Sequence, residues 1–152
     1  IAPLKSLIND QFLRLDALLD EAGIPVWHWH GDVSASQKAK LLKNPEGILQ
    51  ITPESLESML MRRSNDIPRL FGALRYVVID EIHTLIASDR GNQILCQICR
   101  IERKAGVSVR RVGLSATIGN LKAAADWLGG GSMRATAAPV PSPTKLHWRL
   151  GM

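Results

Sequence analysis

The chain has 152 residues, of which 45% are hydrophobic and 22% charged, values typical of one globular domain that exclude a disordered tail or a collagen-like chain. No apolar run approaches the roughly 20 residues of a membrane span, and the first residues do not form a secretory signal. The net charge of +5 is concentrated in residues 91–152, with 9 basic and 2 acidic side chains, which indicates an anionic partner such as nucleic acid or else a solvated basic helix face.

Helical and strand patterns alternate along the chain. Apolar residues at helical spacing predict an amphipathic helix over residues 4–19. Ser34 with Gln37 forms a capping box for a second helix, and Thr52 followed by Pro53 begins a third. Pro68 predicts an irregular segment over residues 64–73. The other predicted elements are strands over 26–30, 47–51, 74–79 and 107–114, and helices over 90–104 and 120–128.

This alternation predicts an α/β fold with a mostly parallel sheet and helical crossovers, in three layers. Ligands in such sheets bind beyond the carboxyl ends of the strands. The first residues of the chain also read as the end of a strand. Polar residues follow this strand end and three others, and we expect them to meet at one edge of the sheet. They are Lys5 and Ser6, Thr52, Asp80 and Glu81, and Ser115 and Thr117.

Asp80 and Glu81 end the apolar run VVIDEIH and carry the strongest chemical signal. Phosphoryl-transfer enzymes use one acid at such a place to hold Mg²⁺, often through water, and a second to position an attacking water. An ordinary strand end with exposed acids is the plain alternative. Ser115 and Thr117 in GLSATIGN could sense a γ-phosphate or simply cap a helix.

Two helix starts could hold phosphates through free backbone N–H groups. One is PLKSLINDQ, with Lys5 and Ser6, and the other is ITPESLESML, with Thr52. Each motif is weak alone, since a surface lysine and a simple helix cap explain them equally.

In this order and spacing, the motifs resemble those of superfamily-2 helicases, specifically the first motor domain of Lhr-type (large helicase-related) DNA helicases of the DEAD/DEAH group. PLKSLINDQ resembles motif Ia, HGDVSASQK the following segment, TPESL motif Ib, DEIH motif II (Walker B) and SAT motif III. The resemblance covers about residues 1–128 and implies a RecA-like P-loop NTPase fold, a three-layer α/β/α domain.

The resemblance also implies roles for single residues. Asp80 would bind the Mg²⁺ of MgATP through water, and Glu81 would activate the hydrolytic water. His83, Ser115 and Thr117 would couple the nucleotide to movement along nucleic acid, with DNA as the expected partner and no membrane. The strand's sugar–phosphate backbone would lie against Pro3, Leu4, Lys5, Ser6, Thr52, Pro53, Glu54 and Ser55.

The chain departs from the family in lacking GxxxxGK[ST], since none of its 12 glycines is followed by Lys. This loop cradles the phosphates. Together with a first residue other than Met, its absence leads us to expect a piece of a longer protein, with the Walker A strand and loop missing from its N-terminus and no activity alone. Residues 1–128 would be the partial motor domain, and residues 129–152 a linker or strand toward a second domain. An unpaired sheet edge would favour self-association.

Two other interpretations remain open. A non-catalytic module could bind nucleic acid through the basic C-terminal third, using Arg100, Arg103, Lys104, Arg110 and Arg111. A zinc site could use Cys96, Cys99, His28 and His30, although cysteines within an apolar helix pattern usually pack as small hydrophobes.

Four tryptophans could stack on bases but are expected to pack in cores or interfaces. They are Trp27, Trp29, Trp127 and Trp148. Two cysteines cannot form a disulfide framework, which suits a reducing compartment. A cytoplasmic, nucleoid-associated protein of bacterial type is the expected setting.

Overall fold

A computed structural model describes residues 1–139, as six α-helices, four strands and two short 3₁₀ turns. Residues 140–152 of the predicted linker or strand over 129–152, with Trp148, lie outside these residues. The helices are α1 (Lys5–Asp20), α2 (Ala35–Lys43), α3 (Pro53–Arg62), α4 (Ile67–Phe71), α5 (Asp89–Ala105) and α6 (Leu121–Gly129). The strands are β1 (Val26–Trp29), β2 (Ile48–Ile51), β3 (Tyr76–Ile79) and β4 (Arg110–Gly113), and the 3₁₀ turns are η1 (Ser64–Asp66) and η2 (Ile82–Thr84).

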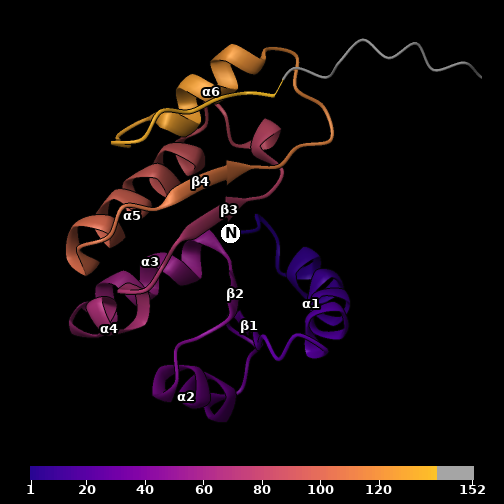
Figure 1. The fold of residues 1–152 in the computed structure, drawn as a ribbon, viewed down its shortest axis with the longest axis vertical. Coiled ribbons are helices and arrows are strands. Elements are labelled where there is room, and N and C mark those ends of the chain that lie inside the picture. Colours follow the sequence, from indigo (N-terminus) through magenta and orange to yellow (C-terminus); the bar gives the residue numbers. More distant parts are fainter. Residues whose placement is uncertain (140–152) are drawn as a thin grey trace, which may run out of the picture.

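The chain's first two residues complete a parallel sheet. β1 pairs with β2, and β3 with β4, both in parallel. Between these pairs, the Ile1 amino group donates to the Val78 carbonyl (2.6 Å) and the Asp80 N–H donates to the Ile1 carbonyl (3.0 Å). On the other side, the Ala2 N–H donates to the Ile51 carbonyl (3.2 Å). The order across the sheet is therefore β1, β2, residues 1–2, β3, β4 (Figure 1).

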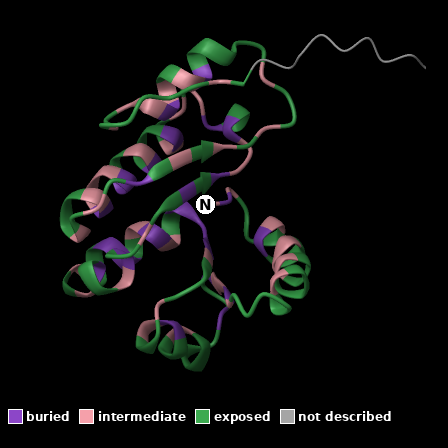
Figure 2. Cartoon of the chain, viewed as in Figure 1, coloured by how far each residue is buried: buried purple, intermediate pink, exposed green. Residues whose placement is uncertain are grey.

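Helices lie on both sides of this sheet. α3, α4 and α5 lie on one side and α1 on the other, where Ile8 is fully buried (Figure 1). Buried residues gather where helices meet strands, whereas most of α1 is exposed or half-buried (Figure 2). The predicted α/β architecture with a parallel sheet is confirmed.

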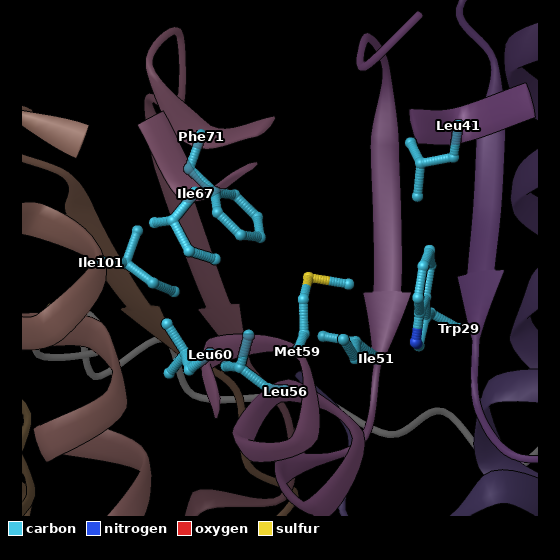
Figure 3. Close-up of a cluster of buried hydrophobic side chains, with 9 residues drawn as sticks. All are labelled: Trp29, Leu41, Ile51, Leu56, Met59, Leu60, Ile67, Phe71 and Ile101. Atoms are coloured by element: carbon cyan, nitrogen blue, oxygen red, sulfur yellow. The ribbon is translucent and has the colours of Figure 1, made fainter. Parts of the chain in front are cut away.

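Two hydrophobic clusters form the core. The first joins Trp29 and Ile51 of the sheet to side chains of α2, α3, α4 and α5 (Figure 3). The second joins Val77 and Ile79 of β3 to α5 and α6. Because α5 contributes to both clusters, it holds the two halves of the sheet together. Trp29 has the expected core position, and Trp27 and Trp127 pack against the clusters half-buried.

Local signals determine where the helices begin. The Ser34 side chain accepts a hydrogen bond from the Gln37 N–H, and Thr52 accepts one from the Ser55 N–H, as predicted. Before β2, Gly47 has a φ of +84°, and a Cβ there would lie 2.0 Å from the Pro25 carbonyl oxygen. A residue without a side chain is therefore required where β1 and β2 come together.

The prediction of an irregular segment over residues 64–73 was wrong. η1 and α4 form there, and Pro68 stands in the first turn of α4, where no backbone N–H donor is needed. Ile67 and Phe71, four residues apart, are both buried in the first cluster. Tertiary burial thus makes a helix of a segment with weak local preference.

One side of the β3–β4 pair is exposed. Tyr76 and Val78 of β3 and Val112 of β4, with Leu114 just after it, are large apolar residues open to solvent. Across residues 1–139, the only strand that pairs with β4 is β3. None of the helices in that range is long and apolar enough to cross a membrane.

Candidate functional site

Five polar segments follow the strand ends at one edge of the sheet. In the order of the strands they are His30 after β1, Thr52 after β2, Pro3 to Ser6 after residues 1–2, Asp80 after β3 and Ser115 after β4. Parallel strands place their carboxyl ends together, which is why segments far apart in sequence share this edge.

Asp80 is held in place from two sides. Its Oδ1 accepts a hydrogen bond from the Glu81 N–H (2.9 Å), and its Oδ2 accepts one from Gln11 Nε2 on α1 (2.8 Å). Gln11 Oε1 lies in turn 3.5 Å from Gln50 Nε2, on β2. The carboxylate is thus fixed by the helix of the motif Ia segment.

Glu81 has a φ of +53°, in the left-handed region that a glutamate rarely adopts. The turn leads the chain into η2, where the Ile82 N–H donates to the Leu114 carbonyl (3.0 Å) and joins the DEIH loop to the end of β4. The strained backbone belongs to a residue whose carboxylate lies 3.1 Å from His83 Nδ1.

His83 links the DEIH and SAT segments. Its Nδ1 lies 2.9 Å from Ser115 Oγ and 3.1 Å from Glu81 Oε2, with hydrogen-bond alignment toward Ser115. Ser115 Oγ donates its only proton to the Thr117 carbonyl (3.0 Å). When the Ser115 proton is used in this way, the contact with His83 requires the tautomer in which Nδ1 carries the proton. Asp80, Glu81, His83 and Ser115 form one cluster, whereas Thr117 joins it through its carbonyl.

The Asp80 carboxylate has the donor chemistry to hold a magnesium ion through water. Among residues 1–139, no three His, Cys, Asp or Glu side chains gather to form a metal cage. Mg²⁺ instead keeps several waters and takes one or two carboxylates plus phosphate oxygens. Each Asp80 oxygen accepts one hydrogen bond and retains another lone pair, so the site suits this kind of binding.

The PLKS segment opens α1 without a side-chain cap, so its first N–H groups are free of such a partner. Leu4, Lys5 and Ser6 are exposed, and Pro3 is half-buried. Lys5 Nζ lies 2.9 Å from Asp32 Oδ2, and this hydrogen bond holds the pKa of Asp32 below its usual range. A carboxylate thus already competes for the lysine that the sequence suggested for phosphate binding.

The TPES segment is mostly engaged within the protein. Thr52 is only 5% exposed and caps α3, and Pro53 is fully buried. The Glu54 carboxylate binds Arg90. Ser55 is half-buried and its hydroxyl accepts a hydrogen bond from Thr52 (3.1 Å). Any contact to a phosphate here would use backbone N–H groups and Ser55 more than Thr52 or Pro53.

Sequence reasoning missed three residues at this edge. Gln11 holds Asp80, and its signal was a polar residue three positions after the buried Ile8, on the same helix face. Asn9 Oδ1 lies 3.0 Å from Nε2 of the buried His30, whose pKa burial lowers. Arg90 stands in the first turn of α5, where a cation opposes the helix dipole.

The other candidate residues are largely used elsewhere. The Arg111 side chain is 3% exposed and paired with Glu102 (3.0 Å), and Arg100 is paired with Glu57 (2.6 Å), which lowers the pKa of Glu57. His28 and His30 share a face as expected, with ring centroids 5.4 Å apart. Cys96 is exposed, so the expectation that it packs as a hydrophobe was wrong, and Cys99 is half-buried.

A sequence model of the DEAD/DEAH box helicase family matches residues 1–124. The chain is 34% identical over 128 residues to the Lhr helicase/uracil glycosylase of Escherichia coli (strain K12), covering 84% of this chain and 8% of that protein. It is 38% identical over 128 residues to the ATP-dependent helicase Lhr-Core of Methanocaldococcus jannaschii, covering 84% of this chain and 14% of that protein. The chain thus spans a small part of these curated relatives.

Solved structures give the same result. The Mycobacterium smegmatis helicase Lhr bound to ssDNA and AMP-PNP matches 91% of this chain and 19% of its own, with a TM-score of 0.73 and 27% identity. The DUF1998 helicase MrfA bound to DNA matches 90% of this chain and 20% of its own, with a TM-score of 0.73 and 33% identity. The RecA-like fold expected from the sequence is thereby confirmed. The chain belongs to the DEAD/DEAH box helicase family and has Lhr helicases among its relatives.

Proposed function

We propose that this chain is part of the motor of an ATP-dependent helicase, in which ATP hydrolysis drives movement along a nucleic-acid strand, with DNA as the substrate. The observation that carries the proposal is the row of polar segments at one sheet edge, where the Asp80 cluster stands next to the Lys5 and Thr52 segments. A relative solved with ssDNA and AMP-PNP supports it.

The acid cluster would serve the nucleotide. Mg²⁺ bound with ATP neutralises phosphate charge, and Asp80 would hold it through water. Glu81 would orient the attacking water. His83 and Ser115 join the DEIH loop to the SAT loop, so a displacement of one loop is passed to the other. Thr117 extends this connection through its carbonyl.

The neighbouring segments would hold the strand. The free N–H groups at the start of α1, the exposed Lys5 and Ser6, and Ser55 at the start of α3 can bind consecutive phosphates. Pro3 and Leu4 set the entry into α1, and Thr52, Pro53 and Glu54 shape the start of α3. Contacts of this kind give little sequence preference and strong salt dependence.

Binding of a fluorescent single-stranded oligonucleotide by the 152-residue chain tests this, across salt concentrations, with and without MgATP. Lys5→Ala should weaken binding and lower the salt slope by about 0.7, the value for one single-strand phosphate contact. Arg103→Ala and Lys104→Ala should leave affinity nearly unchanged. If instead Arg103→Ala and Lys104→Ala weaken binding, Lys5→Ala does not, and MgATP makes no difference, the chain acts as a basic nucleic-acid-binding module.

We also propose that the 152-residue chain alone does not hydrolyse ATP, since its sequence has no GxxxxGK[ST] loop. Residues 1–128 would act as a partial motor domain and residues 129–152 as a connection toward a second one, in a cytoplasmic, nucleoid-associated protein. Robust DNA-stimulated ATP turnover by the purified chain would contradict this.

A further inference from the structure

Arg90 joins the two segments that the proposed function places on the strand. Its Nε donates to Glu54 Oε1 (2.9 Å), in the TPES segment, and Nη2 lies 2.7 Å from the same oxygen. Nη2 also donates to the Pro3 carbonyl (2.6 Å), in the PLKS segment. One guanidinium thus bridges the start of α3 and the residues that lead into α1.

The position of Arg90 is not explained by local preference. It stands in the first turn of α5, where the helix dipole disfavours a cation, and a glycine follows it. Its side chain is 37% exposed and that of Glu54 is 62% exposed, and an ion pair this exposed stabilises a fold very little. Residues placed against local helix preference often serve a functional site, and Arg90 serves the contact between the two segments.

Gly91 fixes Arg90 relative to the DEIH loop. A Cβ at Gly91 would lie 2.0 Å from the Leu85 carbonyl oxygen, just after η2, so only glycine allows this close packing. The Ser88 side chain also accepts a hydrogen bond from the Gly91 N–H (3.0 Å). The first turn of α5 is therefore pressed against the loop that follows Asp80 and Glu81.

From this geometry we infer that Arg90 is a positioning residue that holds the PLKS and TPES segments at a fixed spacing, so that both bind one strand at the same time. The inference rests on the proposed function. If two contacts are rigidly spaced, forming one raises the effective concentration of the other, and loss of either reduces the benefit of its partner. Without the bridge, the two contacts should act independently.

A double-mutant cycle measures this dependence. Lys5→Ala in the PLKS segment and Ser55→Ala in the TPES segment are made singly and together, and affinity for single-stranded DNA is measured in the 152-residue chain. We expect the combined loss to differ from the product of the single losses by about threefold or more. In the Arg90→Ala background this non-additivity should disappear.

Two further variants separate positioning from charge and stability. Glu54→Ala breaks the same bridge but makes the net charge more positive, whereas Arg90→Ala makes it more negative. If the non-additivity disappears in both variants, the change in charge is not the cause. Glu57→Gln breaks the Arg100 ion pair, which also joins α3 to α5, and should keep the non-additivity. Denaturant unfolding checks that each variant is folded, and Glu54→Ala carries the test if Arg90→Ala is not.

The outcomes distinguish the two proposals. If the wild-type chain does not bind the oligonucleotide, or Lys5→Ala and Ser55→Ala have no effect, the proposed function fails. If both matter but their non-additivity survives Arg90→Ala and Glu54→Ala, binding through these segments stands and the positioning role of Arg90 is overturned.

Discussion

Lys5 stands at the proposed strand path already paired with Asp32 at 2.9 Å. Asp32→Asn keeps the side-chain shape but removes the competing charge. We expect affinity for single-stranded DNA to rise about two- to fivefold, the range that an exposed ion pair allows, with a steeper salt slope. Fluorescence anisotropy at pH 8, where the nearby His30 is neutral, provides the measurement.

A matched control is available on α6. Lys122 and Asp126 form another exposed pair at 2.7 Å, outside the proposed strand-binding segments. Asp126→Asn changes the net charge by the same amount and should alter affinity much less. Equal gains from the two variants would mean that overall charge, and not Lys5, determines binding.

His30 should make the fold sensitive to acid. Burial, more than the neighbouring His28, lowers its pKa from the usual 6.5. The unfolded chain therefore takes up the proton first as the pH falls, and stability declines below about pH 6.5 until the native pKa is passed. Urea unfolding at pH 7.5 and 5.5 should show a smaller decline in His30→Gln than in the wild type.

Other titrating groups do not obscure this comparison. Burial lowers the pKa of the Ile1 amino group to about 6, but Ile1 is present in both proteins and its effect cancels in the difference. Asp32 and Glu57 have lowered pKa values, so their stabilising effect is lost only at more acidic pH. An identical decline in the variant would show that His30 does not sense pH.

Single residues could be predicted only where their neighbours in sequence determine their role. Ser34 and Thr52 cap helices as predicted, because a cap needs only the next three residues. The convergence of Asp80 with Ser115 followed from the rule for parallel strands. Gln11 and Arg90 were not assigned, because the partner of Gln11 lies 69 positions away and those of Arg90 lie 36 and 87 positions away.

At the scale of elements, α3 depends on Thr52 for its first turn. Thr52→Val removes the acceptor for the Ser55 N–H and should lower the free energy of unfolding by about 1 kcal/mol. Thr52→Ser keeps the acceptor and should retain most of this stability. Because the cap also orders the start of α3, Thr52→Val should weaken binding to single-stranded DNA.

The cap of α6 provides the comparison. Asn120 accepts a hydrogen bond from the Ala123 N–H (3.0 Å), outside the proposed strand-binding segments. Asn120→Ala should cost similar stability, measured by urea unfolding, and leave DNA affinity unchanged. If both cap variants weaken binding to the same degree, general destabilisation explains the loss and Thr52 has no particular role.

Elements were predictable to different degrees. Long helices with a regular apolar pattern, such as α5, were found nearly whole, because one pattern sets their buried face. α4 was missed because its five residues become helical only by burying Ile67 and Phe71. The place of residues 1–2 between β2 and β3 also depends on partners distant in sequence.

At the scale of the whole molecule, the exposed side of the β3–β4 pair should promote self-association. Val78 and Val112 face each other across the parallel register, both open to solvent, beside the β4 edge. The Arg110 and Leu114 N–H groups donate to the Arg75 and Ile79 carbonyls, just before and at the end of β3. Because alternate residues of a strand direct their N–H groups to opposite sides, those of Arg111 and Gly113 point away from β3. Apolar side chains next to such an edge favour pairing with another copy.

Val112→Lys places a charge on this surface, and we expect it to shift the 152-residue chain toward monomer. Sedimentation velocity over a range of concentrations measures the change. Met61→Lys, which replaces an exposed apolar residue on α3, adds the same charge and should leave association unaltered. Self-association is assigned to the β3–β4 surface only if Val112→Lys reduces it and Met61→Lys does not. A wild-type chain that stays monomeric at every concentration would rule out self-association.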